Sequence, residues 1–155
     1  MTLDEVAGAA ADGTQSVTHA DRSGDAFLQM VMRTTHADAL HQAGRPAEAE
    51  ALFREAERMQ AEWQPGYPLL YSLQGFQYCD LLLAAVERAA WRAVLPAPTG
   101  SGVGDEGLAE ACRTVSQRAT QTLKWVTTQN WLLDIALDHL SSGRAALYEA
   151  ILTAA

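Results

Sequence analysis

The chain has 155 residues, of which 48% are hydrophobic and 19% are charged, proportions typical of a single soluble globular domain. Its formal net charge of −8 leaves no basic face for nucleic acid, and an acidic membrane surface would repel it. The first dozen residues contain aspartate and glutamate but no lysine or arginine, unlike a signal peptide, and no apolar run is long enough to span a membrane. These features predict a cytoplasmic protein that binds neither nucleic acids nor membranes.

The N-terminal half contains the clearest helical pattern. Residues 1–13 are small and acidic and should be frayed or loosely helical, and a short helix is expected over 14–22. Apolar residues three and four apart then predict a helix from Phe27 to a stop at Gly44. A second helix begins at Pro46, because proline is tolerated in a first turn, and these two helices should form an antiparallel hairpin.

Proline and glycine interrupt the middle of the chain twice. The segment 63–68 holds two prolines and a glycine and ends the second helix. A buried helix is expected over 69–83 and a short amphipathic piece over 86–95. Residues 96–104 superficially resemble a phosphate-binding loop, but the Gly-Lys-Ser/Thr ending of that motif is missing, so we interpret them as an exposed flexible loop.

The C-terminal third is also helical in pattern. One long helix is predicted over 108–126, another over 132–140 with a stop at Gly143, and a last one from Arg144. No segment shows the alternation of a strand, and residues that favour helix dominate the composition. The predicted fold class is therefore all-α.

Successive helical hairpins suggest a repeat. The small residues Ala37, Gly75 and Ala136, each in the middle of a hairpin's first helix, lie 38 and 61 residues apart. A tetratricopeptide unit has about 34 residues. The first interval fits one unit with a longer turn, and the second fits one unit with an insertion that begins near Ala84.

Residues 36–56 resemble a tetratricopeptide unit in detail. The matching residues are Ala37, Leu40 and Gly44 in the first helix and its turn, then Ala49, Phe53 and Ala56 in the second helix. The resemblance implies that the small side chains let the two helices cross closely, while Phe53 fills the gap towards the next hairpin.

Two later units match the family pattern less completely. The second unit matches at Tyr71, Gly75 and Tyr78, then at Ala119, Leu123 and Val126. In the third unit Ala136 and Gly143 fit, but Tyr148 stands where a small residue is usual. Segments 67–80 and 130–139 are also similar to repeat regions of large bacterial proteins in which such arrays follow a nucleotide-binding or effector domain.

The resemblance implies an α-solenoid of stacked antiparallel helical hairpins. The expected boundaries are a flexible 1–13, then one domain over 14–155 with units at about 25–62, 67–129 and 130–155, the second with a helix-and-loop insertion over 84–107. In such arrays the first helix of each pair lines a concave groove. Carried over by position, the groove residues are Thr34, Asp38, His41 and Gln42, then Ser72, Phe76, Cys79 and Asp80, then Leu133, Leu137 and Leu140.

The groove residues predict a mixed surface for a partner. Asp38 and Asp80 would make one end acidic and suited to a lysine- or arginine-bearing segment, and the leucines would make the other end apolar. The alternative is that the apolar members simply pack on neighbouring helices. At the C-terminal end, Leu147, Ile151 and Leu152 lack the polar outer face of a capping helix, so either another copy covers them, which favours self-association as an addition, or the chain is one piece of a longer protein.

Candidate catalytic and ligand-binding residues are better explained by structural roles. Asp134 and Asp138 share a helix face that is more simply solvated than a cation site, and His139 lies on an apolar stripe as an interior histidine would. His36 and His41 point in different directions around one helix, so they cannot share a metal ion.

The remaining reactive or aromatic side chains also favour packing. Cys79, Asp80 and His139 could in principle form a nucleophilic catalytic site, but nothing in their spacing places them together. We interpret Cys79 and Cys112 as buried thiols rather than as a disulfide. The four tryptophans, at positions 63, 91, 125 and 131, are interpreted mainly as core, although one of them can anchor a partner.

We therefore expect no catalytic, cofactor or metal site and no enzymatic activity. The predicted function is a protein-interaction or scaffold module that binds a peptide or helix of a partner and self-associates in addition. The alternative is a regulatory domain that senses a small molecule between its helices, which a closed cavity lined by tryptophan and leucine would favour.

Overall fold

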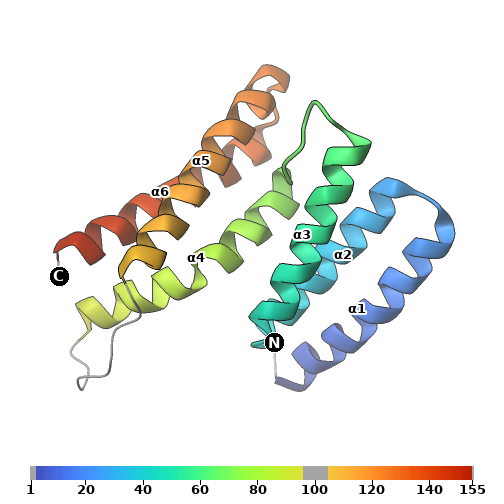
Figure 1. The fold of residues 1–155 in the computed structure, drawn as a ribbon, viewed down its shortest axis with the longest axis horizontal. Coiled ribbons are helices and arrows are strands. Elements are labelled where there is room, and N and C mark those ends of the chain that lie inside the picture. Colours follow the sequence, from blue (N-terminus) through green and yellow to red (C-terminus); the bar gives the residue numbers. More distant parts are fainter. Residues whose placement is uncertain (1–2, 96–104, 155) are drawn as a thin grey trace. The chain divides into compact units, whose positions relative to one another are not determined.

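The computed structural model describes residues 3–95 and 105–154 of the chain. This part consists of helices without a strand, which confirms the all-α prediction (Figure 1). The helices are α1 (Leu3–Ser23), α2 (Ala26–Gln42), α3 (Pro46–Trp63), α4 (Ser72–Val94), α5 (Asp105–Gln129) and α6 (Leu132–Ala154). No helix in these ranges combines the length and the apolar character that crossing a membrane requires.

The chain divides into two compact units, Met1–Leu81 and Leu82–Ala155. The boundary falls inside α4, so one helix contributes to both units. Each unit is described by itself below.

In the first unit, α1, α2 and α3 pack as antiparallel neighbours (Figure 1). Local chemistry defines the α2–α3 hairpin: the carboxylate of Asp25 accepts a hydrogen bond from the backbone N–H of Leu28 and caps α2. Gly44 takes a φ of +75°, which glycine adopts without strain, and Pro46 opens α3. The hairpin and its bounds agree with the prediction.

Small side chains occupy the contact between α2 and α3. Ala37 and Ala49 are fully buried, as the tetratricopeptide resemblance implied. Phe53 is also fully buried and its ring stacks on that of Tyr78 from α4, with centroids 5.0 Å apart. Phe53 thus fills the space between α3 and α4 within the first unit.

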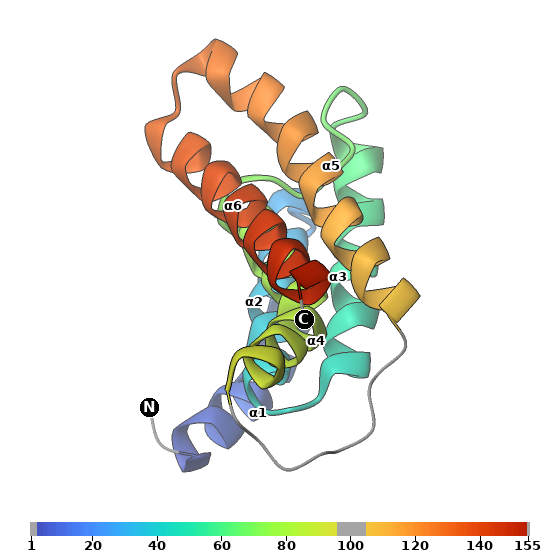
Figure 2. The ribbon, with the colours of Figure 1, turned by 90° about the vertical axis from the view of Figure 1, so that its left-hand side faces the viewer.

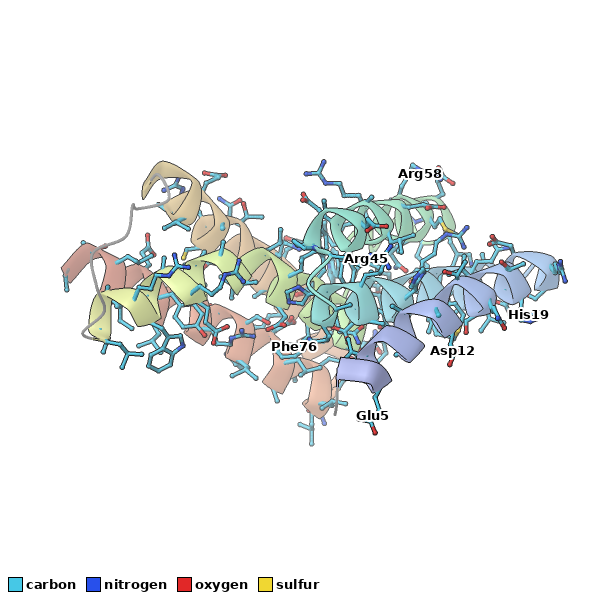
Figure 3. All side chains as sticks on the ribbon, turned by 90° about the horizontal axis from the view of Figure 1, so that it is seen from below. Glu5, Asp12, His19, Arg45, Arg58 and Phe76 are labelled. Atoms are coloured by element: carbon cyan, nitrogen blue, oxygen red, sulfur yellow. The ribbon has the colours of Figure 1, made fainter. Side chains whose placement is uncertain are left out.

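The N-terminal segment 1–13, which we expected to be frayed or loosely helical, is helical from Leu3 onwards, because α1 begins there. Tertiary packing compensates for the weak helix propensity of its glycines: Val6 and Ala10 are buried, and Gly13 leaves room for the imidazole of His36 on α2. Glu5, Asp12 and His19 lie on the exposed face of this helix (Figure 3).

The link between α3 and α4 is held by buried polar contacts. The amide of Gln60, which is almost completely buried, donates to the side-chain oxygen of Gln64 and to the carbonyl of Tyr67, both at 2.9 Å. The backbone N–H of Leu70 donates to Glu57 at 3.1 Å. These bonds satisfy groups that the break at 63–68 leaves without helical partners.

The second unit contains the C-terminal half of α4 together with α5 and α6, and α5 and α6 pack against each other as an antiparallel pair (Figure 2). The expected break after Leu83 and the separate piece at 86–95 are not formed, because α4 continues to Val94. Residues 84–94 contain neither glycine nor proline, so nothing local ends the helix. The loop expected at 96–104 lies outside the described residues.

A second correction concerns the third predicted unit. The stop at Gly143 is absent, and α6 is one continuous helix rather than a hairpin. A single glycine inside a helix is tolerated at a cost of about 1 kcal/mol, and Ser141, Ala145 and Tyr148 are buried around it. Ala136, aligned with Ala37 and Gly75 as a close-packing residue, is exposed.

Both cysteines are buried free thiols, as predicted. The tryptophans differ from expectation: Trp63, Trp91 and Trp131 are exposed, and only Trp125 is half-buried. The indole of Trp63 has a ring contact with Phe27 at 5.7 Å between centroids. An indole at a helix end can keep one face against an apolar neighbour while the other face meets water.

Candidate interaction site

A cluster of polar side chains lies on α2 and α4 in the first unit. The imidazole Nε2 of His41 is 3.4 Å from a carboxylate oxygen of Asp80, and these side chains are 14% and 28% exposed. Asp38 lies one helical turn before His41 and interacts electrostatically with both His41 and Asp80. We call these three residues the acidic cluster.

The carboxyl group of Asp38 has a raised pKa. Burial raises its pKa, and the negative charge of Asp80 raises it further. Hydrogen bonds from the side-chain amides of Gln42 and Gln77, together with His41, oppose the rise. Two carboxylates thus share a partly desolvated place in which a cation from outside would stabilise both.

The structure brings together four of the predicted groove residues: Asp38, His41, Gln42 and Asp80. Gln77 was missed, although it lies three residues before Asp80 and therefore on the same side of α4. Ser72 and Phe76 are half-buried on the first turns of α4.

Other predicted groove residues lie elsewhere. Thr34 is fully buried and donates to the carbonyl of Val31, because it shares the buried face of α2 with Ala37. Cys79 is buried in the same way. Leu133, Leu137 and Leu140 belong to α6 in the second unit, where Leu133 and Leu140 are exposed and Leu137 is half-buried.

No family model, curated protein or solved structure matches this chain.

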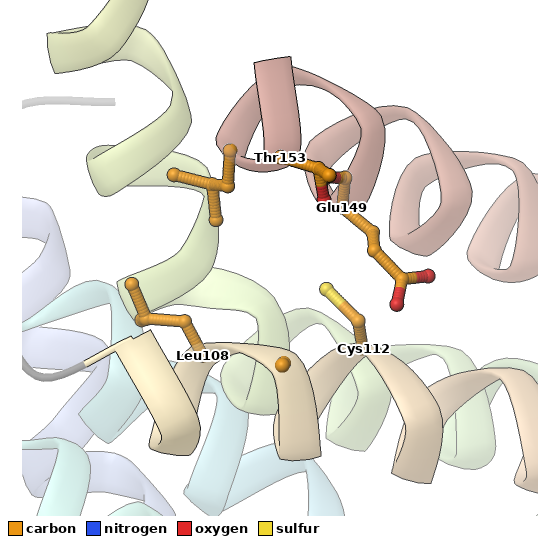
Figure 4. A pocket seen from close by; sticks show the side chains of 6 residues that line it. Leu108, Cys112, Glu149 and Thr153 are labelled. Atoms are coloured by element: carbon orange, nitrogen blue, oxygen red, sulfur yellow. The ribbon is translucent and has the colours of Figure 1, made fainter. Parts of the chain in front are cut away.

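A pocket of about 340 Å³ lies between the start of α5 and the end of α6. Its lining residues are Leu108, Ala109, Cys112, Glu149, Leu152 and Thr153 (Figure 4). The Cys112 thiol lies on the α5 side, opposite Glu149 and Thr153 of α6 (Figure 4). Burial and the nearby charge of Glu149 raise the pKa of this thiol, so it stays protonated and is a poor nucleophile.

Asp138 on α6 is a partly buried carboxyl group in contact with α5. The hydroxyl of Thr122 donates to its Oδ1 at 2.8 Å, whereas its Oδ2 is buried without a hydrogen-bond partner among the described residues. Burial raises the pKa of Asp138 to about 6, with a further contribution from Asp134. We had expected Asp138 to lie on a solvated helix face, and this expectation was wrong, because its carboxyl group is partly buried against α5.

The side chain of His139 also differs from the prediction, because it is exposed rather than interior. It follows Asp138 on α6 and therefore points to a different side of that helix. Within residues 3–95 and 105–154, no three side chains of histidine, cysteine, aspartate or glutamate are placed to hold a metal ion.

Proposed function

We propose that this chain is a protein-interaction module whose acidic cluster on α2 and α4 binds a basic segment of a partner protein. The observation that carries the proposal is the electrostatic interaction of Asp38 with Asp80 at a partly buried place: burial raises the pKa of Asp38, and the charge of Asp80 raises it further. A lysine or arginine side chain from a partner would interact favourably with both carboxylates. Because the carboxylates are already partly buried, this interaction would be stronger than one in open water.

Neighbouring residues on α4 support a segment that is both basic and apolar. Leu73 and Phe76 precede Asp80 by seven and four residues, so the three lie along one side of the helix. Leu73 is 51% exposed and Phe76 is half-buried. An amphipathic helix with a basic residue next to apolar ones is the partner of matching chemistry.

Selection from a displayed random peptide library on the immobilised full chain tests this function. We expect selected peptides to be enriched in lysine and arginine next to apolar residues. Asp80→Asn should remove most of this enrichment, since it deletes the charge while keeping the shape of the side chain. Glu110→Gln, an exposed acid outside the acidic cluster, is the matched control and should select the same peptides as the wild type.

Circular dichroism of both variants checks that each is folded. The proposal fails if the selected peptides carry no basic residues, or if a folded Asp80→Asn chain selects the same peptides with equal efficiency.

The pocket between α5 and α6 supports a second candidate function, small-molecule binding. A volume of about 340 Å³ lies at the lower end of the range for small-ligand pockets. Leu108 and Leu152 supply apolar walls and Glu149 supplies a carboxylate, so an aliphatic primary amine is the matching ligand class. The lining contains no tryptophan, in contrast to the closed cavity that would most favour this alternative.

A thermal-shift comparison of hexylamine with hexanol tests this second function. Stabilisation by the amine alone, reduced in Glu149→Gln, would support it. Equal effects of the two compounds would exclude recognition by Glu149.

A further inference from the structure

An apolar stripe runs along the outer side of α6. Its members are exposed, follow one another at alternating intervals of three and four residues, and are Leu133, Ala136, Leu140, Gly143, Leu147 and Ala150. The three leucines are 69%, 49% and 55% exposed. Single exposed leucines are common, but a continuous stripe with this heptad spacing is the pattern of a helix that pairs with another helix.

The stripe alternates between large and small side chains. Its leucines recur every seven residues, and alanine or glycine recurs every seven residues between them. In a parallel pair of two such helices, each layer would place leucine against leucine or a small residue against a small residue. Crowded leucine layers would then alternate with poorly filled ones. In an antiparallel pair the order of one helix is reversed, and every leucine meets a small residue of the other helix.

We propose that α6 pairs with α6 of a second copy of this chain in an antiparallel, two-fold symmetric arrangement. The opposed residues are Leu133 with Ala150, Ala136 with Leu147, and Leu140 with Gly143. Each of these contacts forms twice around the two-fold axis, so the stripe is complementary to itself. This pairing does not depend on the acidic cluster or on the binding of a basic peptide.

Gly143 supplies an independent observation. Glycine inside a helix lowers helix stability relative to alanine, and the close approach of another helix is one reason for such a residue. Here a Cβ at position 143 would meet nothing within 4 Å in the described chain. The described fold therefore gives no reason for a glycine, whereas a leucine from a second helix lying directly over this position does.

The charges around the stripe are compatible with the pairing. The chain carries 19 acidic residues, but the stripe contains none of them. The row beside it, at positions 132, 139, 146 and 153, consists of Leu, His, Ala and Thr, all exposed. In an antiparallel pair this row meets its own copy, so no two carboxylates face each other.

The size of the contact sets the expected strength. A helix of 23 residues is about 35 Å long, and a contact about 10 Å wide covers on the order of 350 Å² on each copy. The total lies below the roughly 1,200 Å² of standard stable interfaces. We therefore expect a dimer that dissociates on dilution through the micromolar range rather than an obligate one.

Sedimentation equilibrium of the full chain over a range of concentrations tests the pairing. We expect a monomer–dimer equilibrium whose dissociation constant rises at least about tenfold in Leu140→Glu, because a charge replaces the central leucine. Leu28→Glu is the matched control, since Leu28 is also exposed, at 38%, but lies on α2 in the other unit, and it should dimerise like the wild type. Circular dichroism confirms that both variants are folded.

Disulfide trapping tests the direction of the pairing. We expect an equimolar mixture of Ala136→Cys and Leu147→Cys chains to form a cross-linked heterodimer, because these positions oppose each other. Ala136→Cys alone should not cross-link, since its own copy lies about 16 Å away along the helix axis. The native cysteines are buried and do not compete.

Three results would overturn the proposal. A chain that stays monomeric at millimolar concentration would show that the stripe does not pair with a second copy. A folded Leu140→Glu chain that dimerises as well as the wild type would place the interface elsewhere. Cross-linking of Ala136→Cys with itself would show a parallel pair.

Discussion

Phe53 of α3 stacks on Tyr78 of α4, with ring planes 11° apart and centroids separated by 5.0 Å. This contact joins the α2–α3 hairpin to the next helix within the first unit. Replacing Phe53 with alanine should lower the free energy of unfolding by about 3–5 kcal/mol, because the change leaves a cavity where the ring was fully buried. Urea unfolding followed by circular dichroism measures the loss.

Phe27→Ala is the control for that experiment. Phe27 is 51% exposed and has its ring contact with the exposed Trp63, so its loss should cost about 1 kcal/mol or less. Equal losses in the two variants would contradict the central role given to Phe53.

Arg33 connects three helices of the first unit. Its guanidinium group donates to Asp21 of α1 at 2.7 and 3.2 Å and to Glu55 of α3 at 2.8 Å. A lysine at this position cannot reproduce the forked geometry, so Arg33→Lys should lower the free energy of unfolding by about 1–2 kcal/mol. The comparison is Arg58→Lys, whose exposed pair with Glu62 should be worth only a few tenths of a kcal/mol.

Guanidinium chloride would screen these ion pairs, so urea unfolding at low ionic strength is the suitable measurement. The loss in Arg33→Lys should shrink in 1 M sodium chloride. A loss no larger than that of Arg58→Lys would show that the three-helix ion pair has no special role.

Asp138 makes stability depend on pH. A carboxyl group whose pKa is higher in the folded chain than in the unfolded chain binds more protons when folded, so its contribution to stability falls as the pH rises from about 4 to about 6. Asp138→Asn should therefore be more stable than the wild type at pH 7.5, by about 1 kcal/mol because the group is only partly buried. The difference should disappear near pH 3.5.

Thermal unfolding of both chains across this pH range measures the effect. Asp134→Asn, which removes the neighbouring carboxylate from the same helix face, should reproduce only a small part of it. A difference between Asp138→Asn and wild type that stays constant from pH 3.5 to 7.5 would contradict a raised pKa.

Two helical glycines should respond to alanine in opposite ways. At position 75 a Cβ would lie 2.5 Å from the carbonyl oxygen of Leu70, so Gly75→Ala should be destabilising by more than about 1 kcal/mol. At position 143 nothing lies within 4 Å, so Gly143→Ala should stabilise the dilute monomer by about 0.5–1 kcal/mol. Urea unfolding at low protein concentration compares the two, and the same sign for both would contradict the prediction.

The sequence predicted helix ends well wherever backbone chemistry is local. Gly44 and Pro46 define the α2–α3 turn because one adopts a positive φ and the other suits a first helical turn. Gly143 has no such local effect, and α6 continues through it because the residues on both sides are buried. The start of α1 likewise depends on its contact with α2, which periodicity alone does not show.

The candidate site shows the same limit. Asp38, His41 and Asp80 were placed together because a repeat register assigns equivalent faces to α2 and α4. Thr34 was misplaced because the same register does not show how deeply each side chain is buried. The leucines on the outer face of α6 were assigned to the groove, because their spacing identifies an apolar side of the helix but does not show what covers that side.

The two buried thiols lie in different units, Cys79 in the first and Cys112 in the second. A thiol reagent too large for the pocket beside Cys112 therefore modifies either one only when the surrounding helices separate, and the two modification rates record the opening of each half. Because α4 belongs to both halves, the two rates also measure whether disturbance of one half spreads into the other. The native chain thus contains its own pair of probes for folding cooperativity, with no label to introduce.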